Sequence, residues 1–311
     1  MPVKFRTEFK AREGDFLLNP AKPVVLLGSC FSQNMAQKMN EHDWEALLPA
    51  GTLYNPLSIA EALFMMTDSE YGLQRFENSL FQDNGIWHSS FFDSSFSSRN
   101  RDDSLEEFLT QSRLIHEKLS EGGQLVVTFG TSICYFSLIE KKVVGNCHKQ
   151  PQTFFSRRRV NTNEIFMIWG KVLAMLRERY PGIKTIFTVS PVRHLKDGFE
   201  GNARSKAVLL LSIEDIVVNN PDSRYFPAFE IVTDDLRDYR FYADDLVHPS
   251  SQAVDYIWEK FVETFIDSKG KKLLEEGLKK HKTLHHRPLL GALSRPLSET
   301  NDEKDEKLIV D

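Results

Sequence analysis

The segment Val24-Val25-Leu26-Leu27-Gly28-Ser29-Cys30 decides the fold that the sequence predicts. Its run of apolar residues is typical of a strand buried on both faces, as in a parallel sheet. Apolar residues then recur at a spacing of four over 31–39, which predicts a helix. Ser29 is therefore expected in the turn between a buried strand and a helix.

Strands and amphipathic helices alternate along the rest of the chain. Apolar runs predict further strands at 44–48, 124–129, 185–189 and, more weakly, 226–231. Helical periodicity is found at 56–66, 105–119, 161–179, 203–219 and 250–265. This alternation predicts an α/β fold with three layers, α/β/α, around a mostly parallel sheet. Asn84-Gly85 marks a hairpin insertion near 76–100, and a second insertion is expected near 134–147.

Length and composition predict one large domain with a charged extension. The chain has 311 residues, of which 41% are hydrophobic, and 39 basic against 44 acidic residues give a net charge of −5. We expect a domain over 1–268 and an extension over 269–311, whose last part is disordered by composition. The mild acidity argues against a nucleic-acid partner. No apolar run reaches the ~18–20 residues of a membrane helix, so no membrane partner is expected either.

The chain carries no signal for secretion, metal binding or nucleotide binding. Residues 1–23 are charged throughout, without the apolar core of a signal peptide. Cys30, Cys134 and Cys147 form no CxxC pair, and no P-loop or GxGxxG motif occurs. We therefore expect a cytoplasmic protein with reduced thiols, no metal and no other cofactor. The sequence does not predict an oligomeric state.

Ser29, Asp245 and His248 are the residues that point to nucleophilic catalysis. A serine at the amino end of a helix is a favoured helix cap, but it also stands beside N–H groups that can bind an oxyanion. Asp245 lies three residues before His248, close enough to hold the imidazole in the tautomer that accepts a serine proton. A serine after the first predicted strand, combined with Asp-x-x-His before the helix at 250–265, is a more specific pattern than either part alone.

These residues, together with several other short segments, resemble the SGNH (GDSL-like) hydrolase superfamily. Gly28-Ser29-Cys30-Phe31-Ser32 is similar to the name motif of its GSCFA family, with Ser32 in place of alanine. The other segments that carry the resemblance occur in order along the chain: Gly51-Thr52-Leu53-Tyr54-Asn55-Pro56, Gly130-Thr131-Ser132, Asn146-Cys147-His148-Lys149 and Ser190-Pro191-Val192-Arg193-His194.

The resemblance implies a hydrolase site with Ser29 as nucleophile, His248 as base and Asp245 as its orienting carboxylate. It also implies an oxyanion hole made by the N–H of Ser29, a loop glycine and an asparagine. Gly51 is the candidate glycine. The superfamily's Gly-x-Asn-Asp block is missing, so the third donor is open between Thr131 and Asn146.

Substrate contacts are expected from the segments that follow the other strands. His148 lies next to Cys147, and adjacent side chains bind one metal ion poorly, so substrate contact is favoured over metal binding. Arg193 and His194 are expected to bind an oxygen of the substrate, the alternative being a structural ion pair with Asp197.

The function predicted on this basis is ester hydrolysis, with removal of an acetyl or another small acyl group from a carbohydrate or other small molecule. One alternative is an O-acyltransferase that uses the same serine to acylate a sugar hydroxyl. Another is a non-catalytic carbohydrate-binding module on the same scaffold, against which the presence of Ser29, Asp245 and His248 argues.

Overall fold

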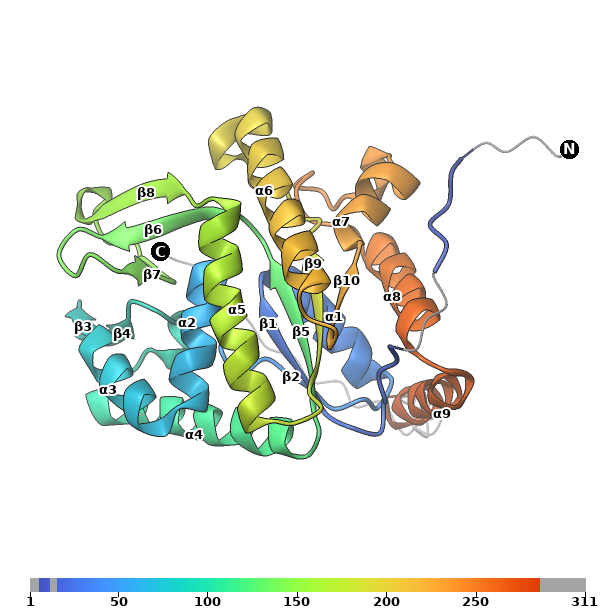
Figure 1. Cartoon of the computed structure of the whole chain (residues 1–311), viewed down its shortest axis with the longest axis horizontal. Helices are drawn as coiled ribbons and strands as arrows, with labels where there is room; N and C mark the ends of the chain where they lie inside the picture. The colour runs from blue at the N-terminus through green and yellow to red at the C-terminus, as the bar shows by residue number, and fades with distance from the viewer. Residues whose placement is uncertain (1–5, 12–15, 286–311) are drawn as a thin grey trace, which may run out of the picture.

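A parallel five-stranded sheet forms the centre of the protein, in a computed structural model that describes residues 6–11 and 16–285. The tail that the sequence predicts to be disordered, at 299–311, lies outside the described residues. The strand order is β10-β9-β5-β1-β2. The strands are β1 (Val24–Gly28), β2 (Ala46–Leu47), β5 (Gln124–Phe129), β9 (Lys184–Val189) and β10 (Ser223–Phe226). The predicted three-layer α/β/α class is confirmed (Figure 1).

The two faces of the sheet pack into two separate hydrophobic clusters. In β1, Val25 and Leu27 join the cluster on one face, whereas Val24 and Leu26 join the cluster on the other. This alternation explains the continuous apolar run, because a strand covered on both faces has no polar side. The helices of the first layer are α2 (Pro56–Thr67), α4 (Arg101–Ser120), α5 (Thr162–Arg179) and α6 (Gly198–Val218). The second layer holds α1 (Cys30–Glu41), α8 (Ser251–Phe265) and α9 (Ser268–His285).

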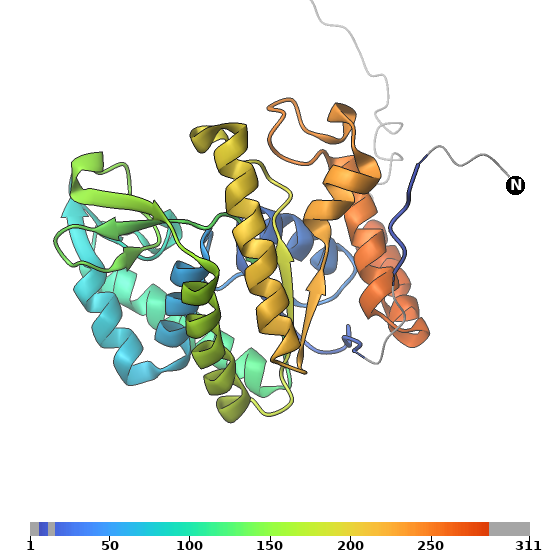
Figure 2. The ribbon, with the colours of Figure 1, turned by 45° about the horizontal axis from the view of Figure 1, so that its top comes forward.

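The connections reverse direction between β1 and β5. The chain leaves β1 through α1 on one face to reach the edge strand β2, then crosses on the other face through α2 and α4 to β5. From β5 the order continues outward through β9 to β10, as the turned view in Figure 2 also shows. In open parallel sheets, ligands bind at such a reversal, beyond the carboxyl ends of the strands. The topology thus places the strongest site candidate where β1 and β5 end.

Both expected insertions are present, and each is larger than the sequence indicates. Leu80–Asp83 (β3) and Ile86–Ser89 (β4) form the predicted hairpin, preceded by α3 (Ser69–Ser79). The second insertion is a three-stranded sheet of β6 (Ile133–Ser137), β7 (Val143–Val144) and β8 (Phe155–Arg159). Strand β8 was not predicted from the sequence, because its three consecutive arginines, at 157–159, are more typical of a loop. Figure 1 shows both insertions beyond α5, at one end of the molecule.

The predicted strand at 226–231 is wrong beyond its first residue. Strand β10 ends at Phe226, and Pro227 cannot donate to a strand ladder. Its carbonyl instead accepts from the N–H of Ile231 at 2.9 Å, so a helical segment, α7 (Ala228–Glu230), follows. None of the helices in the described ranges is long and apolar enough to cross a membrane.

Candidate active site

A cavity of about 520 Å³ opens where β1, β5 and β9 end. The segments that follow these strands contribute to its wall, together with the loop before α8 and the small sheet of β6 to β8. The residues of its wall that matter for chemistry are Cys30, Asn55, Thr131, Arg193, His194 and His248. Five segments that lie far apart in the sequence thus meet at one cavity.

The turn after β1 requires a glycine. Gly28 has φ +138°, and a Cβ at this position would lie 2.2 Å from the carbonyl oxygen of Thr128. Its own carbonyl accepts from the N–H of Leu53 at 2.8 Å, which ties the turn to the loop before α2. Any residue with a side chain would push β1 away from β5 at the point where both strands reach the cavity.

The structure closes Ser29 off from the cavity. Its side chain is 1% exposed, and its Oγ has no hydrogen-bond partner among the described residues. The hydrogen bond expected between Ser29 Oγ and His248 Nε2 is therefore not formed. Ser29 precedes α1 as its N-cap residue, but its hydroxyl makes no capping bond.

His248 and Asp245 form the contact that their spacing predicts. Nδ1 of His248 lies 2.6 Å from Oδ2 of Asp245. The other carboxylate oxygen accepts from the backbone N–H groups of Val247 and His248, both at 2.9 Å. Leu246 takes φ +57° to close this turn. The loop thus holds the carboxylate in place beside the ring, while no hydrogen bond or ion pair joins neighbouring Asp244 to His248 in the described structure.

This arrangement fixes the charge of Asp245 and the tautomer of His248. The N–H of His248 and the imidazole hold the pKa of Asp245 down, at about 2, so the carboxylate is ionised at neutral pH. The ionised carboxylate accepts a hydrogen bond from Nδ1–H of His248, and this tautomer leaves Nε2 as the acceptor. His248 is half-buried in the cavity wall and can take a proton from a group inside it.

The N–H groups expected in an oxyanion hole already have partners. The N–H of Ser29 donates to Thr128 at 3.3 Å, and the N–H of Gly51 donates to Leu48 at 3.3 Å. The N–H of Thr131 donates to the carbonyl of Tyr54 at 3.0 Å. Gly51 is also absent from the cavity wall, because its loop packs against Asp93. The structure thus gives no support to Gly51 as a donor.

Two asparagines reach the cavity wall. Asn146, which the sequence offers as a donor, accepts from the N–H of His148 at 2.8 Å through its Oδ1. Asn55 was missed, because Asn-Pro at the start of α2 is typical of a helix cap. Its Oδ1 does accept from the N–H of Ser58 at 2.9 Å. That bond orients the amide, and its Nδ2 has no hydrogen-bond partner in the described structure.

Arg193 and His194 both lie in the cavity wall. The guanidinium of Arg193 stacks on Tyr242, 4.1 Å from its ring centre, and on Tyr239 at 5.1 Å. Burial, together with the charge of Lys206, lowers the pKa of His194 to about 4, so its imidazole is neutral at pH 7. Nε2 of His194 is buried without a partner in the described structure, and it lies close to Gly130, as does Cβ of Ser29.

His148 is not part of the cavity wall, contrary to the substrate role expected from the sequence. Its Nε2 lies 2.8 Å from the carbonyl oxygen of Ser89 and 2.9 Å from that of Phe92. The ring also packs against His88, with ring centres 4.6 Å apart. His148 lies outside the cavity because the loop after β7 directs its ring toward the β3–β4 hairpin. The ring thereby links the two insertions.

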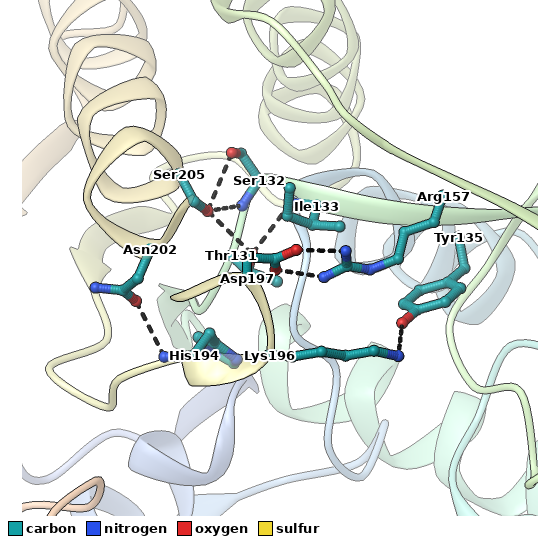
Figure 3. A network of polar contacts seen from close by, with 10 residues as sticks. All are labelled: Thr131, Ser132, Ile133, Tyr135, Arg157, His194, Lys196, Asp197, Asn202 and Ser205. Atoms are coloured by element: carbon teal, nitrogen blue, oxygen red, sulfur yellow. Dashed lines mark hydrogen bonds and ion pairs between the residues drawn. The ribbon is translucent and has the colours of Figure 1, made fainter. Parts of the chain in front are cut away.

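A polar network joins the loop after β9 to the small sheet (Figure 3). Arg157 on β8 forms a two-pronged ion pair with Asp197, so the alternative pairing of Asp197 with Arg193 is wrong. Lys196 donates to the hydroxyl of Tyr135 at 2.7 Å. Deeper in the network, the hydroxyl of Thr131 lies 3.0 Å from that of Ser205 on α6, so this oxyanion candidate is engaged as well.

Lys206 is a second residue that sequence analysis missed. It is 1% exposed, and Nζ donates to the carbonyls of Gly130 and Ser190, each at 2.7 Å. Burial lowers the pKa of this lysine to about 7. The lysine fixes the ends of β5 and β9 beneath the cavity. The sequence does carry a signal for this role, because Lys206 lies on the apolar face of the helix predicted at 203–219, where a charged residue is unexpected.

Comparison with protein families decides the relationship of this chain to known proteins. The model of the GSCFA family matches residues 23–261. The chain belongs to the GSCFA family. The matched range includes every residue of the cavity wall, from Cys30 to His248. A comparison with curated proteins gives no match.

A comparison with solved structures gives a distant match for this GSCFA protein. A carbohydrate esterase family 3 protein from Talaromyces cellulolyticus aligns with a TM-score of 0.31 and 11% sequence identity. The alignment covers 83% of this chain and 99% of the other.

Proposed function

We propose that this GSCFA protein hydrolyses esters, removing acetyl or another small acyl group from a carbohydrate. The observation that carries the proposal is the position of His248, whose Nδ1 lies 2.6 Å from Asp245 while the ring borders the cavity. An imidazole held by a carboxylate is the general base that acyl transfer through a covalent intermediate needs. The resemblance to the SGNH superfamily supports the same chemistry.

The nucleophile in this proposal comes from the turn after β1. Ser29 is the candidate that the sequence singles out, and for attack its hydroxyl has to leave its closed position and turn toward the cavity. The helix α1 begins directly after this turn, so its first N–H groups favour negative charge there. Negative charge that develops at this turn while a covalent acyl intermediate forms is therefore stabilised by the local backbone.

Asn55 is the proposed oxyanion donor. Its Oδ1 is held by the N–H of Ser58, which orients the amide, and its Nδ2, in the wall of the cavity, has no partner among the described residues. A donor that is already held in place and has only water to bond to gives up no protein hydrogen bond when it binds a developing oxyanion. Asn146 lies in the same wall and its Oδ1 also accepts a backbone N–H, so it is the second candidate donor, whereas the hydroxyl of Thr131 is engaged with that of Ser205.

A carbohydrate substrate is proposed from the character of the wall. Tyr54, Tyr135 and Asn146 combine aromatic faces with hydrogen-bonding groups, which suits the mixed apolar and hydroxylated surface of a sugar. Arg193 adds a cation that has no carboxylate partner among the described residues. This cation can bind a hydroxyl, carbonyl or carboxylate oxygen of the substrate.

The proposal is tested with 4-nitrophenyl acetate and glucose pentaacetate. The wild-type protein should release 4-nitrophenol and acetate, and His248→Ala should lose at least about 100-fold in kcat/KM, the lower range for a lost general base. His116→Ala is the matched control, because it removes an imidazole that lies outside the cavity and contacts Tyr180. Equal activity of the wild type and His248→Ala would reject the proposal.

A further inference from the structure

Two neighbouring residues after β1 face different environments. Cys30, the first residue of α1, is partly exposed and lines the cavity. Ser29, one residue earlier, is closed off, and no described residue bonds to its hydroxyl. The group that a bound substrate meets in this turn is therefore the thiol and not the hydroxyl.

The thiol lies at the amino end of a twelve-residue helix, among groups that can activate it. Burial raises the pKa of Cys30, while the backbone N–H groups of Cys30 and Phe31 and the charge of Lys206 act in the opposite direction. The net effect keeps the thiol protonated at rest, so its use as a nucleophile requires a base. Since His248 lines the same cavity and is held by Asp245, a base is available.

The other two thiols lack this combination. Cys134 lies on β6 and is buried in the first hydrophobic cluster, where desolvation raises its pKa to about 12. Cys147 does line the cavity, but it sits in the loop after β7 and not at a helix terminus. Cys30 is thus the thiol that shares both the cavity and a helix amino terminus.

We propose that Cys30, and not Ser29, is the nucleophile of this site, an inference that rests on the proposed ester hydrolysis. Sγ of Cys30 attacks the ester carbonyl carbon while its proton passes to Nε2 of His248. A C–S bond forms, and the C–O bond breaks as the alcohol oxygen takes that proton. Water then attacks the thioester and gives its proton to His248, which returns it to the departing sulfur. The acid is released and the thiol is restored.

Ser29 has a different role in this arrangement. Its extended backbone, at φ −72° and ψ 173°, begins the helix, and its carbonyl accepts from the N–H of Ser32 at 2.8 Å. The space around the Ser29 side chain accepts only a small group, because Gly130 is close to it. A Cβ added to Gly130 would lie 3.3 Å from Cβ of Ser29. Ser29 is therefore a positioning residue that presents Cys30 to the cavity.

The experiment locates the acyl group. The full-length protein is mixed with 4-nitrophenyl acetate and quenched in acid, and its peptides are mapped by mass spectrometry. Wild type and Ser29→Ala should both carry acetyl on Cys30, as a thioester that neutral hydroxylamine removes. Cys30→Ala should lose at least about 100-fold in kcat/KM and carry no such adduct. Acetyl on Ser29 in the wild type, or full activity of Cys30→Ala, would overturn the inference.

A second measurement does not depend on ester hydrolysis. Iodoacetamide should alkylate Cys30 faster than Cys147, and His248→Ala should slow the reaction at Cys30 without changing the rate at Cys147. Melting temperatures of all variants establish that they fold. If the wild type hydrolyses no ester, the proposed function fails, and the alkylation still shows whether His248 activates Cys30. Equal rates at Cys30 in the wild type and His248→Ala would contradict the inference.

Discussion

The guanidinium carbon of Arg193 lies 4.1 Å from the ring centre of Tyr242, at the wall of the cavity, and no carboxylate within the described ranges pairs with it. The ring holds the stem and face of the guanidinium, which leaves its N–H groups available for a ligand. An arginine fixed in this way differs from the nearby Arg157, whose charge is taken up by Asp197.

Arg193→Met should therefore weaken substrate binding and not the fold. We expect kcat/KM for 4-acetoxybenzoate to fall about tenfold or more, the loss of one hydrogen bond to a charged group. The neutral analogue 4-acetoxybenzamide should lose less. Melting temperatures should change little, because the side chain is partly exposed and its stacking is worth only ~0.5–1 kcal/mol.

Arg224→Met is the matched control for this prediction. Arg224 also stacks on an aromatic ring, 4.9 Å from the centre of Phe16, but it lies on β10, away from the cavity. It should leave the preference between the two substrates unchanged. If Arg193→Met instead lowered the melting temperature and left both kcat/KM values intact, Arg193 would be a structural residue.

Asp245→Asn should reduce activity and preserve the fold. The amide is the same size and keeps an oxygen for the N–H groups of Val247 and His248, but it removes the charge that fixes a proton on Nδ1 of His248. In a histidine–carboxylate pair, such a change costs up to ~10⁴-fold in kcat. Steady-state hydrolysis of 4-nitrophenyl acetate measures the loss. Asp244→Asn is the control, and a larger loss there would transfer the role to Asp244.

The sequence predicts the sheet and the gathering of the strand ends, because both depend on local patterns. Continuous apolar runs mark β1, β5 and β9, and a capping box of Asn161 and Glu164 marks the start of α5. The spacing of Asp245 and His248 is short enough for one turn to create their contact. These features need no knowledge of the distant parts of the chain.

The details of the cavity depend on long-range packing that no local pattern encodes. Gly28 lets β1 approach β5 closely, because a Cβ there would lie 2.2 Å from the carbonyl oxygen of Thr128. The local sequence does not show that Cys30 then lines the cavity while Ser29 is closed off. His148 leaves the site because the β3–β4 hairpin supplies two carbonyl acceptors for its ring. Lys206 lies beneath the cavity because the residues after β5 and β9 both present carbonyl oxygens to its Nζ.

Asn55→Asp separates the two roles of Asn55. Aspartate caps a helix as well as asparagine, so the bond from the N–H of Ser58 should persist and the melting temperature should stay close to wild type. The variant lacks the donor Nδ2 and adds a negative charge. We expect kcat to fall roughly 10²–10³-fold, the usual cost of losing one oxyanion donor. Activity within a few-fold of wild type would exclude Asn55 as a donor.

Lys206→Met tests the burial of the lysine beneath the cavity through the pH dependence of stability. Because the folded pKa, about 7, lies below that of the unfolded chain, the unfolded state binds more protons between these values. The cost of burying Lys206 is therefore full below pH 7 and is relieved as the pH rises. From pH 7 to pH 9, wild type should gain about 2 kcal/mol of unfolding free energy relative to Lys206→Met, measured with urea.

Lys260→Met is the control for the buried lysine, because its site has the opposite balance. Lys260 is also buried, which lowers its pKa, but the carboxylate of Glu263 at 3.0 Å and the charge of Glu8 outweigh that effect and raise it. The difference between wild type and Lys260→Met should therefore stay constant from pH 7 to pH 9. If the stability of Lys206→Met also ran parallel to wild type, Lys206 would carry its full charge in the folded protein. The ends of β5 and β9 would then be held by an ammonium group at every pH tested.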